Sequence, residues 1–113
     1  MKYIYEIPDS FWSLFRSRNR DIYVEALLQI NEEYEYNNYF LSREVCLEIL
    51  GDFYTQKKIT LEAEETEDEL DMLETPASRI LNWLLKAQWL KKIEDYNTLV
   101  THIVIPDYAA IFI

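Results

Sequence analysis

The sequence predicts a mainly helical α+β fold, a winged helix-turn-helix domain that ends in a C-terminal β-wing. Three long segments carry apolar residues at helical spacing, and after Trp89 the apolar period shortens from 3.6 to about 2. The 113 residues suffice for one domain and not for two, and half of them are hydrophobic. Residues 1–113 are therefore expected to form a single domain around one core.

The first two predicted elements are a short helix and a long one. Asp9 or Ser10 can cap the short helix, because their side-chain oxygens accept bonds from backbone N–H groups that are otherwise free. Apolar residues at helical spacing predict a long helix over residues 21–34. Asn37 and Asn38 end this helix, since Asn tolerates turn and left-handed conformations.

The second long helix follows Ser42, a favourable N-cap. Gly51, the only glycine in the chain, lies in its middle, where it costs about 1 kcal/mol relative to Ala. Close packing against another backbone would explain this glycine. Helical spacing puts three apolar residues on one face of this helix, with two further apolar residues beside them: Val45, Ile49 and Phe53, flanked by Cys46 and Leu50.

A short strand at residues 59–61 is predicted next, followed by an acidic insertion at residues 62–74. The insertion holds eight acids and no base, and Thr66 with Glu69 matches a capping box, which favours a short helix there. The whole chain has a net charge of −10, and without this insertion 13 acids would face 11 bases. The negative charge is thus concentrated in one segment.

The third long helix has the clearest start, with Thr75 as N-cap and Pro76 at the first helical position, where no N–H is needed. A wide apolar stripe should face the core: Ala77, Ile80, Leu81, Leu84 and Leu85. No glycine follows this helix, so the bend before the wing must form without one.

Two strands joined by a turn at residues 96–98 are predicted to form the wing. After Pro106, residues 108–113 read as a further strand-like run. A domain that finishes on such a run is expected to be a fragment of a longer protein.

The sequence contains few candidates for catalytic or metal-binding residues. His102 stands without an obvious partner on a predicted strand, and Cys46 lies in a helical apolar pattern. The acidic insertion lacks the fixed spacing and central glycine of a calcium loop. We therefore expect a protein that is not an enzyme and needs no cofactor or metal. A single cysteine, no signal peptide and no membrane span favour the cytoplasm.

The fold raises DNA binding as an alternative, in the form of a winged-helix transcriptional regulator. Its candidate nucleic-acid contacts are the polar residues of the third helix and of the wing: Arg79, Asn82, Lys86, Lys91 and Lys92. The adjacent carboxylates repel phosphate, so direct DNA contact by this domain is not expected.

Aromatic residues favour a protein–protein interface instead. The chain has nine Tyr and three Trp, more than one small core readily hides with the polar groups satisfied. The candidate interface residues gather at the N-terminus and between the first two long helices: Tyr3, Tyr5, Phe11, Trp12, Phe15, Tyr34, Tyr36, Tyr39 and Phe40. A plain scaffold domain whose acidic insertion docks on a basic partner is a third possibility.

Two segments, IPDSFWSLFRSRNRDIYVEALLQINEEYEYNNYFLSREVC and IVIPDYAAIFI, resemble the N-terminal region of JetA. JetA is the kleisin-like, MukF-related subunit of Wadjet, a bacterial antiplasmid defence system built on an SMC complex. The resemblance implies that the domain is a winged-helix dimerisation module. It also implies that the full-length protein binds an SMC ATPase and a KITE subunit, while a separate subunit, JetD, cleaves the plasmid. It carries over no interface residue. The predicted function is thus non-catalytic assembly, through a homodimer.

Overall fold

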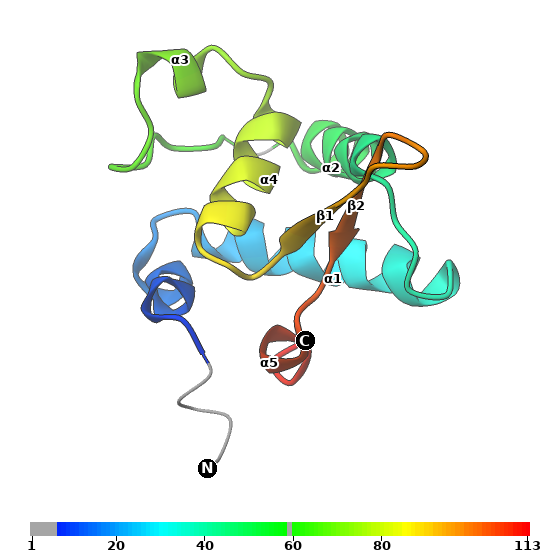
Figure 1. Ribbon diagram of the computed structural model, residues 1–113. Helices are drawn as coiled ribbons and strands as arrows, with labels where there is room; N and C mark the ends of the chain where they lie inside the picture. Colours follow the sequence, from blue (N-terminus) through cyan, green and yellow to red (C-terminus); the bar gives the residue numbers. More distant parts are fainter. Residues whose placement is uncertain (1–6, 59) are drawn as a thin grey trace.

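The computed structural model describes residues 7–58 and 60–113 (Figure 1). In chain order its elements are η2 (Asp9–Arg16), α1 (Arg20–Tyr36), α2 (Arg43–Lys57), α3 (Glu69–Met72), α4 (Pro76–Lys86), β1 (Lys91–Asp95), β2 (Val100–Val104) and α5 (Asp107–Ala110). Most of these elements are helices, and the two strands form one antiparallel sheet near the C-terminus. The predicted α+β class is therefore confirmed, and the order of elements is compatible with a winged helix.

The core lies between α1, α2 and α4, which pack against one another. Their buried faces include Ile30 of α1, Leu50 of α2 and Leu84 of α4, each with no exposed surface. Complete burial of one such side chain contributes about 1.5–3 kcal/mol. These three helices hold the fold together and position everything else.

The predicted starts of the second and third long helices are confirmed. Ser42 Oγ accepts a bond from the Val45 N–H at 3.2 Å, and Thr75 Oγ1 accepts one from the Ser78 N–H at 3.2 Å. Pro76 occupies the first helical position of α4, as expected. Both helices thus begin where their cap residues indicate.

The prediction for the first short helix is wrong in its cap. The segment is a 3-10 helix, its N-cap is Pro8, and no side chain caps it. Ser10 instead donates to the Ala87 carbonyl oxygen at 3.3 Å, beyond the end of α4. A tertiary hydrogen bond has replaced the local one, and it ties η2 to the segment that leads into the hairpin.

The apolar residues of α2 differ in how far they are buried. Cys46, Leu50 and Phe53 are buried, whereas Val45 is 40% exposed. Packing on α1 and α4 buries the flanking residues Cys46 and Leu50 more fully than Val45. A Cβ added at Gly51 would meet nothing within 4 Å, so the predicted close backbone contact is wrong.

The two strands predicted after α4 are confirmed as an antiparallel hairpin, in which Lys91 pairs with Val104 and Asp95 pairs with Val100. Its third neighbour is the segment before α2, since the Ile103 N–H donates to the Leu41 carbonyl at 2.8 Å and Ser42 bridges to His102. The strand predicted at 59–61 is not found at residues 60 and 61, and residue 59 lies outside the described residues.

The strand-like run predicted for residues 108–113 is wrong, because α5 begins directly after Pro106. The fixed φ of proline suits the residue before a helix, and its missing N–H cannot join a ladder. Tyr108 of α5 donates to the Gln88 carbonyl at 2.6 Å. Gln88 itself has a φ of 66°, so it makes the bend that usually falls to glycine.

Candidate functional site: a covered helix face and an exposed apolar edge

The acidic segment, residues 62–74, is fastened to the domain at its first half. The Glu64 carboxylate accepts bonds from the Asn19 amide at 2.9 Å, from the Tyr23 hydroxyl at 2.9 Å and from the Ser17 hydroxyl. Asn19 is almost fully buried and also bonds both backbone groups of Glu62. Burial, with Glu64 nearby, raises the pKa of the Tyr23 hydroxyl, which stays a donor.

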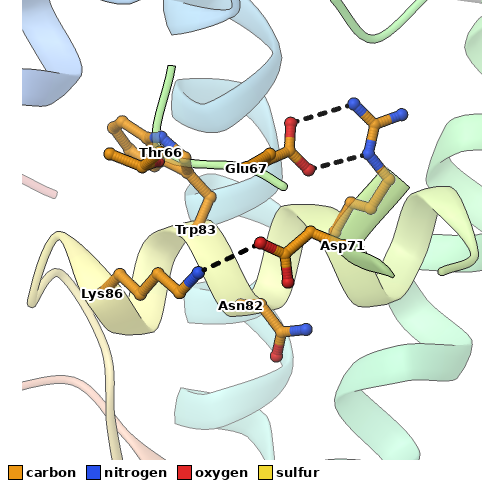
Figure 2. A pocket seen from close by; sticks show the side chains of 7 residues that line it. Thr66, Glu67, Asp71, Asn82, Trp83 and Lys86 are labelled. Atoms are coloured by element: carbon orange, nitrogen blue, oxygen red, sulfur yellow. Dashed lines mark hydrogen bonds and ion pairs between the residues drawn. The ribbon is translucent and has the colours of Figure 1, made fainter. Parts of the chain in front are cut away.

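Next along the chain, the acidic segment lies on the polar face of α4 (Figure 2). Arg79 donates from Nε and Nη2 to the two oxygens of Glu67, at 2.9 and 3.0 Å. Both side chains are nearly buried, with 10% and 8% of their surfaces exposed. Lys86 Nζ lies 3.6 Å from an Asp71 oxygen in a second, more exposed ion pair. The hydrogen bonds from Arg79 lower the pKa of Glu67, against the effect of burial.

The second half of the acidic segment is held more loosely. The predicted short helix is present as α3, but its capping box joins Asp68 and Asp71 rather than Thr66 and Glu69. The capping prediction missed by two residues because several acids in this run satisfy the same pattern. None of the four residues of α3 is buried, and Leu73 beside it is 82% exposed.

The five candidate nucleic-acid contacts therefore fall into two groups. Arg79 and Lys86 are engaged by the acidic segment, and Asn82 lines the same pocket between them. Lys92 is exposed on β1, and Lys91 Nζ lies 5.7 Å from the centre of the Tyr108 ring. The α4 face that would read DNA in a winged helix is thus occupied by carboxylates of the same chain.

The candidate interface aromatics separate by burial. Phe11 has no exposed surface and stacks on Trp89, with ring centres 3.7 Å apart, so it belongs to the core. Trp12 and Tyr34 are partly buried against the core. Tyr3 and Tyr5 lie outside the described residues. Four of the nine remain as largely exposed surface: Phe15, Tyr36, Tyr39 and Phe40.

Three of these four lie where α1 connects to α2, on the same side of the fold as the hairpin turn (Figure 1). The Phe40 ring packs on His102 of β2, with ring centres 4.3 Å apart, and His102 is paired with Ile93 across the hairpin. We name this surface the apolar edge. It consists of exposed residues from the connection and from the hairpin: Tyr36, Tyr39, Phe40, Ile93, Tyr96 and Leu99.

Two residues of the apolar edge have a backbone conformation that favours other residue types. Tyr39 has a φ of 64° and Leu99 a φ of 59°, while their side chains are 65% and 86% exposed. In this left-handed region Gly or Asn costs less than a bulky residue. Neither side chain recovers that cost by full burial in the domain, and strain of this kind is typical of functional surfaces.

The hairpin half of the apolar edge, Ile93, Tyr96 and Leu99, was missed by sequence reasoning. The alternation of apolar and polar residues after Trp89 predicts strands, but it does not indicate which apolar residues face solvent. Ile93 follows its partner His102 to the outer face. The sequence does indicate exposure for Tyr96, because a large aromatic side chain at a hairpin turn lies too far from the core to be buried.

Neither candidate for chemistry forms a reactive site. Cys46 is fully buried, and burial raises its pKa to about 12, so the thiol stays protonated and unreactive. His102 lies beneath Phe40, and its Nδ1 is buried without a hydrogen-bond partner. Among residues 7–58 and 60–113, no cluster of His, Cys, Asp and Glu could hold a metal ion. Within those ranges, no helix has the length and apolar character that crossing a bilayer requires.

Comparison with protein families gave one result. A family model described as "Wadjet protein JetA" matches residues 29–113, from the middle of α1 to the end of the chain. Neither the curated proteins nor the solved structures yielded a match. The matched region includes α4, the acidic segment and the whole apolar edge.

Proposed function

The chain belongs to the JetA family of Wadjet proteins, and on that premise we propose that it is a non-catalytic assembly domain that associates with a second copy of itself. The Wadjet system is the setting that the family supplies. Self-association through the apolar edge is the activity that the described residues support best.

One observation carries the proposal: Tyr39 and Leu99 keep large side chains in solvent at left-handed backbone positions. Asn or Gly at these positions would stabilise the isolated domain and expose less apolar surface. Exposed aromatic side chains beside aliphatic ones are the usual anchors of protein interfaces. A contact that covers both residues would offset the cost of keeping them.

The distribution of charge is compatible with a second copy as the occupant. Each chain has a net charge of −10, so two copies repel unless their acidic parts stay apart. The green acidic segment and the hairpin turn lie at opposite sides of the fold in Figure 1. Two copies that meet edge to edge therefore keep their acidic segments at a distance.

Family membership is also the basis for proposing a wider assembly. In the full-length protein we propose that regions outside these 113 residues bind an SMC ATPase and a KITE subunit, in the cytoplasm, as part of antiplasmid defence. A transcriptional regulator is the weaker proposal, because it would need the α4 face that Glu67 and Asp71 occupy.

Light scattering coupled to gel filtration tests the proposal on the 113-residue chain, at 5–100 µM as an order-of-magnitude range for protein self-association. We expect a dimer that dissociates on dilution. A strict monomer across the whole range would overturn the proposal for this domain.

A pair of matched variants then locates the contact. Tyr39→Ser with Phe40→Ser should raise the dissociation constant about 30-fold, because loss of interface anchors costs about 2 kcal/mol. Leu70→Ser with Leu73→Ser removes two similarly exposed apolar side chains from the acidic segment and should leave the dimer unchanged. Equal weakening of self-association by both variants would show that the apolar edge is not the site of contact.

A further inference from the structure

We infer that the polar face of α4 is a masked binding surface for the phosphate backbone of duplex nucleic acid, held closed by the chain's own acidic segment. This inference goes beyond the proposed self-association and does not depend on it. It concerns a different face of the molecule and a different class of ligand.

The face presents its donors in one row. Arg79, Asn82 and Lys86 are spaced i, i+3 and i+7, so they share one side of α4. Lys92 of β1 borders the same surface, where it lines a hollow together with Asn82, Lys86 and Asp71. A helix and the strand that follows it thus supply three cations and an amide to one continuous surface, which is the chemistry that a phosphate backbone requires.

The carboxylates of the acidic segment occupy the positions that phosphate oxygens would take. The Arg79 fork engages both oxygens of Glu67 in two parallel hydrogen bonds, and the same fork geometry serves carboxylate and phosphate alike. Asp71 lies opposite Lys86, and both residues line the same pocket as Asn82 (Figure 2). The segment therefore acts as an internal competitor for any anion that approaches α4.

The acidic segment is bonded more strongly to the domain at its Glu64 end than at its α3 end. Glu64 accepts three bonds from groups at the start of α1 and just before it, so this end stays attached. Towards α3, the ion pair between Asp71 and Lys86 is half-exposed and no α3 residue is buried. An exposed pair of this kind contributes little and is weakened by salt. The α3 end can therefore move away from Lys86, while Glu64 and the nearly buried Glu67–Arg79 pair hold the first half in place.

The test is fluorescence anisotropy with a labelled DNA duplex about 20 base pairs long, at sodium chloride concentrations on the order of 50–200 mM. The test variant is Glu67→Gln with Asp71→Asn, which neutralises the two carboxylates on α4. The matched control is Glu65→Gln with Glu69→Gln. It removes the same charge from two carboxylates of the same segment that make no bond to α4 in the described structure.

We expect the test variant to bind the duplex at least tenfold more tightly than the control at the lowest salt. Two released cations should also steepen the slope of log K against log salt by about 1.8. Adding Arg79→Ala and Lys86→Ala to the test variant should abolish the gain. Circular dichroism checks folding, and Asp71→Asn alone, at a more exposed site, replaces the pair should the double variant unfold.

Equal binding by the test variant and the control would overturn the inference, since net charge alone would then account for the change. Absence of binding by every variant would overturn it as well. Light scattering on the same samples reports self-association separately, so either proposal can fail while the other stands.

Discussion

The polar face of α4 and the apolar edge differ in whether their side chains are paired within the domain. On α4, charged groups that could meet an external partner meet the acidic segment instead, and the Arg79–Glu67 pair is nearly buried. On the apolar edge, side chains such as Phe40, 66% exposed, stay in solvent although the core lies close by. The domain thus pairs the cations of this helix face internally and leaves apolar surface unpaired.

This difference indicates that the domain in this conformation favours apolar partners over charged ones. Binding through charge has to displace an internal competitor that is covalently attached, and therefore always present at high effective concentration. Binding through the apolar edge has no such competitor among the described residues. Composition alone pointed the same way, because a net charge of −10 opposes nucleic acid, but the contacts give the physical reason.

The largest expected effect comes from breaking the anchor of the acidic segment. Asn19→Ala removes a buried amide that bonds Glu64 and both backbone groups of Glu62. Loss of these bonds should lower the free energy of unfolding by about 3 kcal/mol, measured by urea denaturation. Asn31→Ala, which removes one exposed bond, is the control and should change it by less than about 0.5 kcal/mol. A similar effect of both would mean that the anchor is not structural.

A smaller loss is expected from Glu67→Gln, which removes one charge of the nearly buried pair. We predict about 2 kcal/mol at neutral pH, as for a hydrogen bond between charged groups. The Glu67 pKa is lowered in the folded protein, so its stabilisation is present above the unfolded value of about 4.3 and is lost as pH falls through the folded value. The stability gap between wild type and variant should therefore close in acid; a constant gap from pH 7 to about pH 2 would contradict this origin.

Gly51→Ala should stabilise the domain by about 1 kcal/mol, because Ala favours a helix and its Cβ meets nothing within 4 Å. Gly51 belongs neither to the acidic segment nor to the apolar edge. The variant therefore gives a firmer background in which both surfaces can be altered. Thermal denaturation measures the gain, and a loss of stability would reveal a contact of Gly51 that the fold does not suggest.

The smallest change in stability, with the most specific signature, is expected at Leu99. Leu99→Asn should raise the stability of the monomer by about 0.5 kcal/mol, since Asn tolerates the left-handed backbone. The same change should weaken self-association about fivefold through loss of an apolar contact. Higher stability in denaturation together with weaker self-association in light scattering would support the contrast between folding and assembly. A change of both quantities in the same direction would contradict it.

Much of the fold could be predicted from local signals. Ser42 and Thr75 mark helix starts because a cap bonds its own helix, which the sequence alone reveals. Local reasoning failed where a distant group decided the outcome. Ser10 bonds the residue after α4 instead of capping η2, and packing with α1 and α4 decides that Cys46 is more deeply buried than Val45.

The candidate surfaces were predicted in part for the same reason. The acidity of residues 62–74 was plain, but the sequence did not reveal that Glu67 reaches Arg79 twelve residues away. The aromatic excess predicted an exposed patch, and Tyr36, Tyr39 and Phe40 are exposed. The exposure of Ile93 depends on the register of the hairpin, which pairs it with His102 and could not be predicted from alternation alone.

The most direct test of the contrast between the two surfaces is sedimentation equilibrium of the wild-type chain at about 0.05 and 0.5 M sodium chloride, where screening lengths differ roughly threefold. Association through the apolar edge should yield a dimer that is as tight or tighter at high salt, because salt screens repulsion between chains of charge −10. A chain that stays monomeric, or a dimer that dissociates steeply as salt rises, would contradict the account.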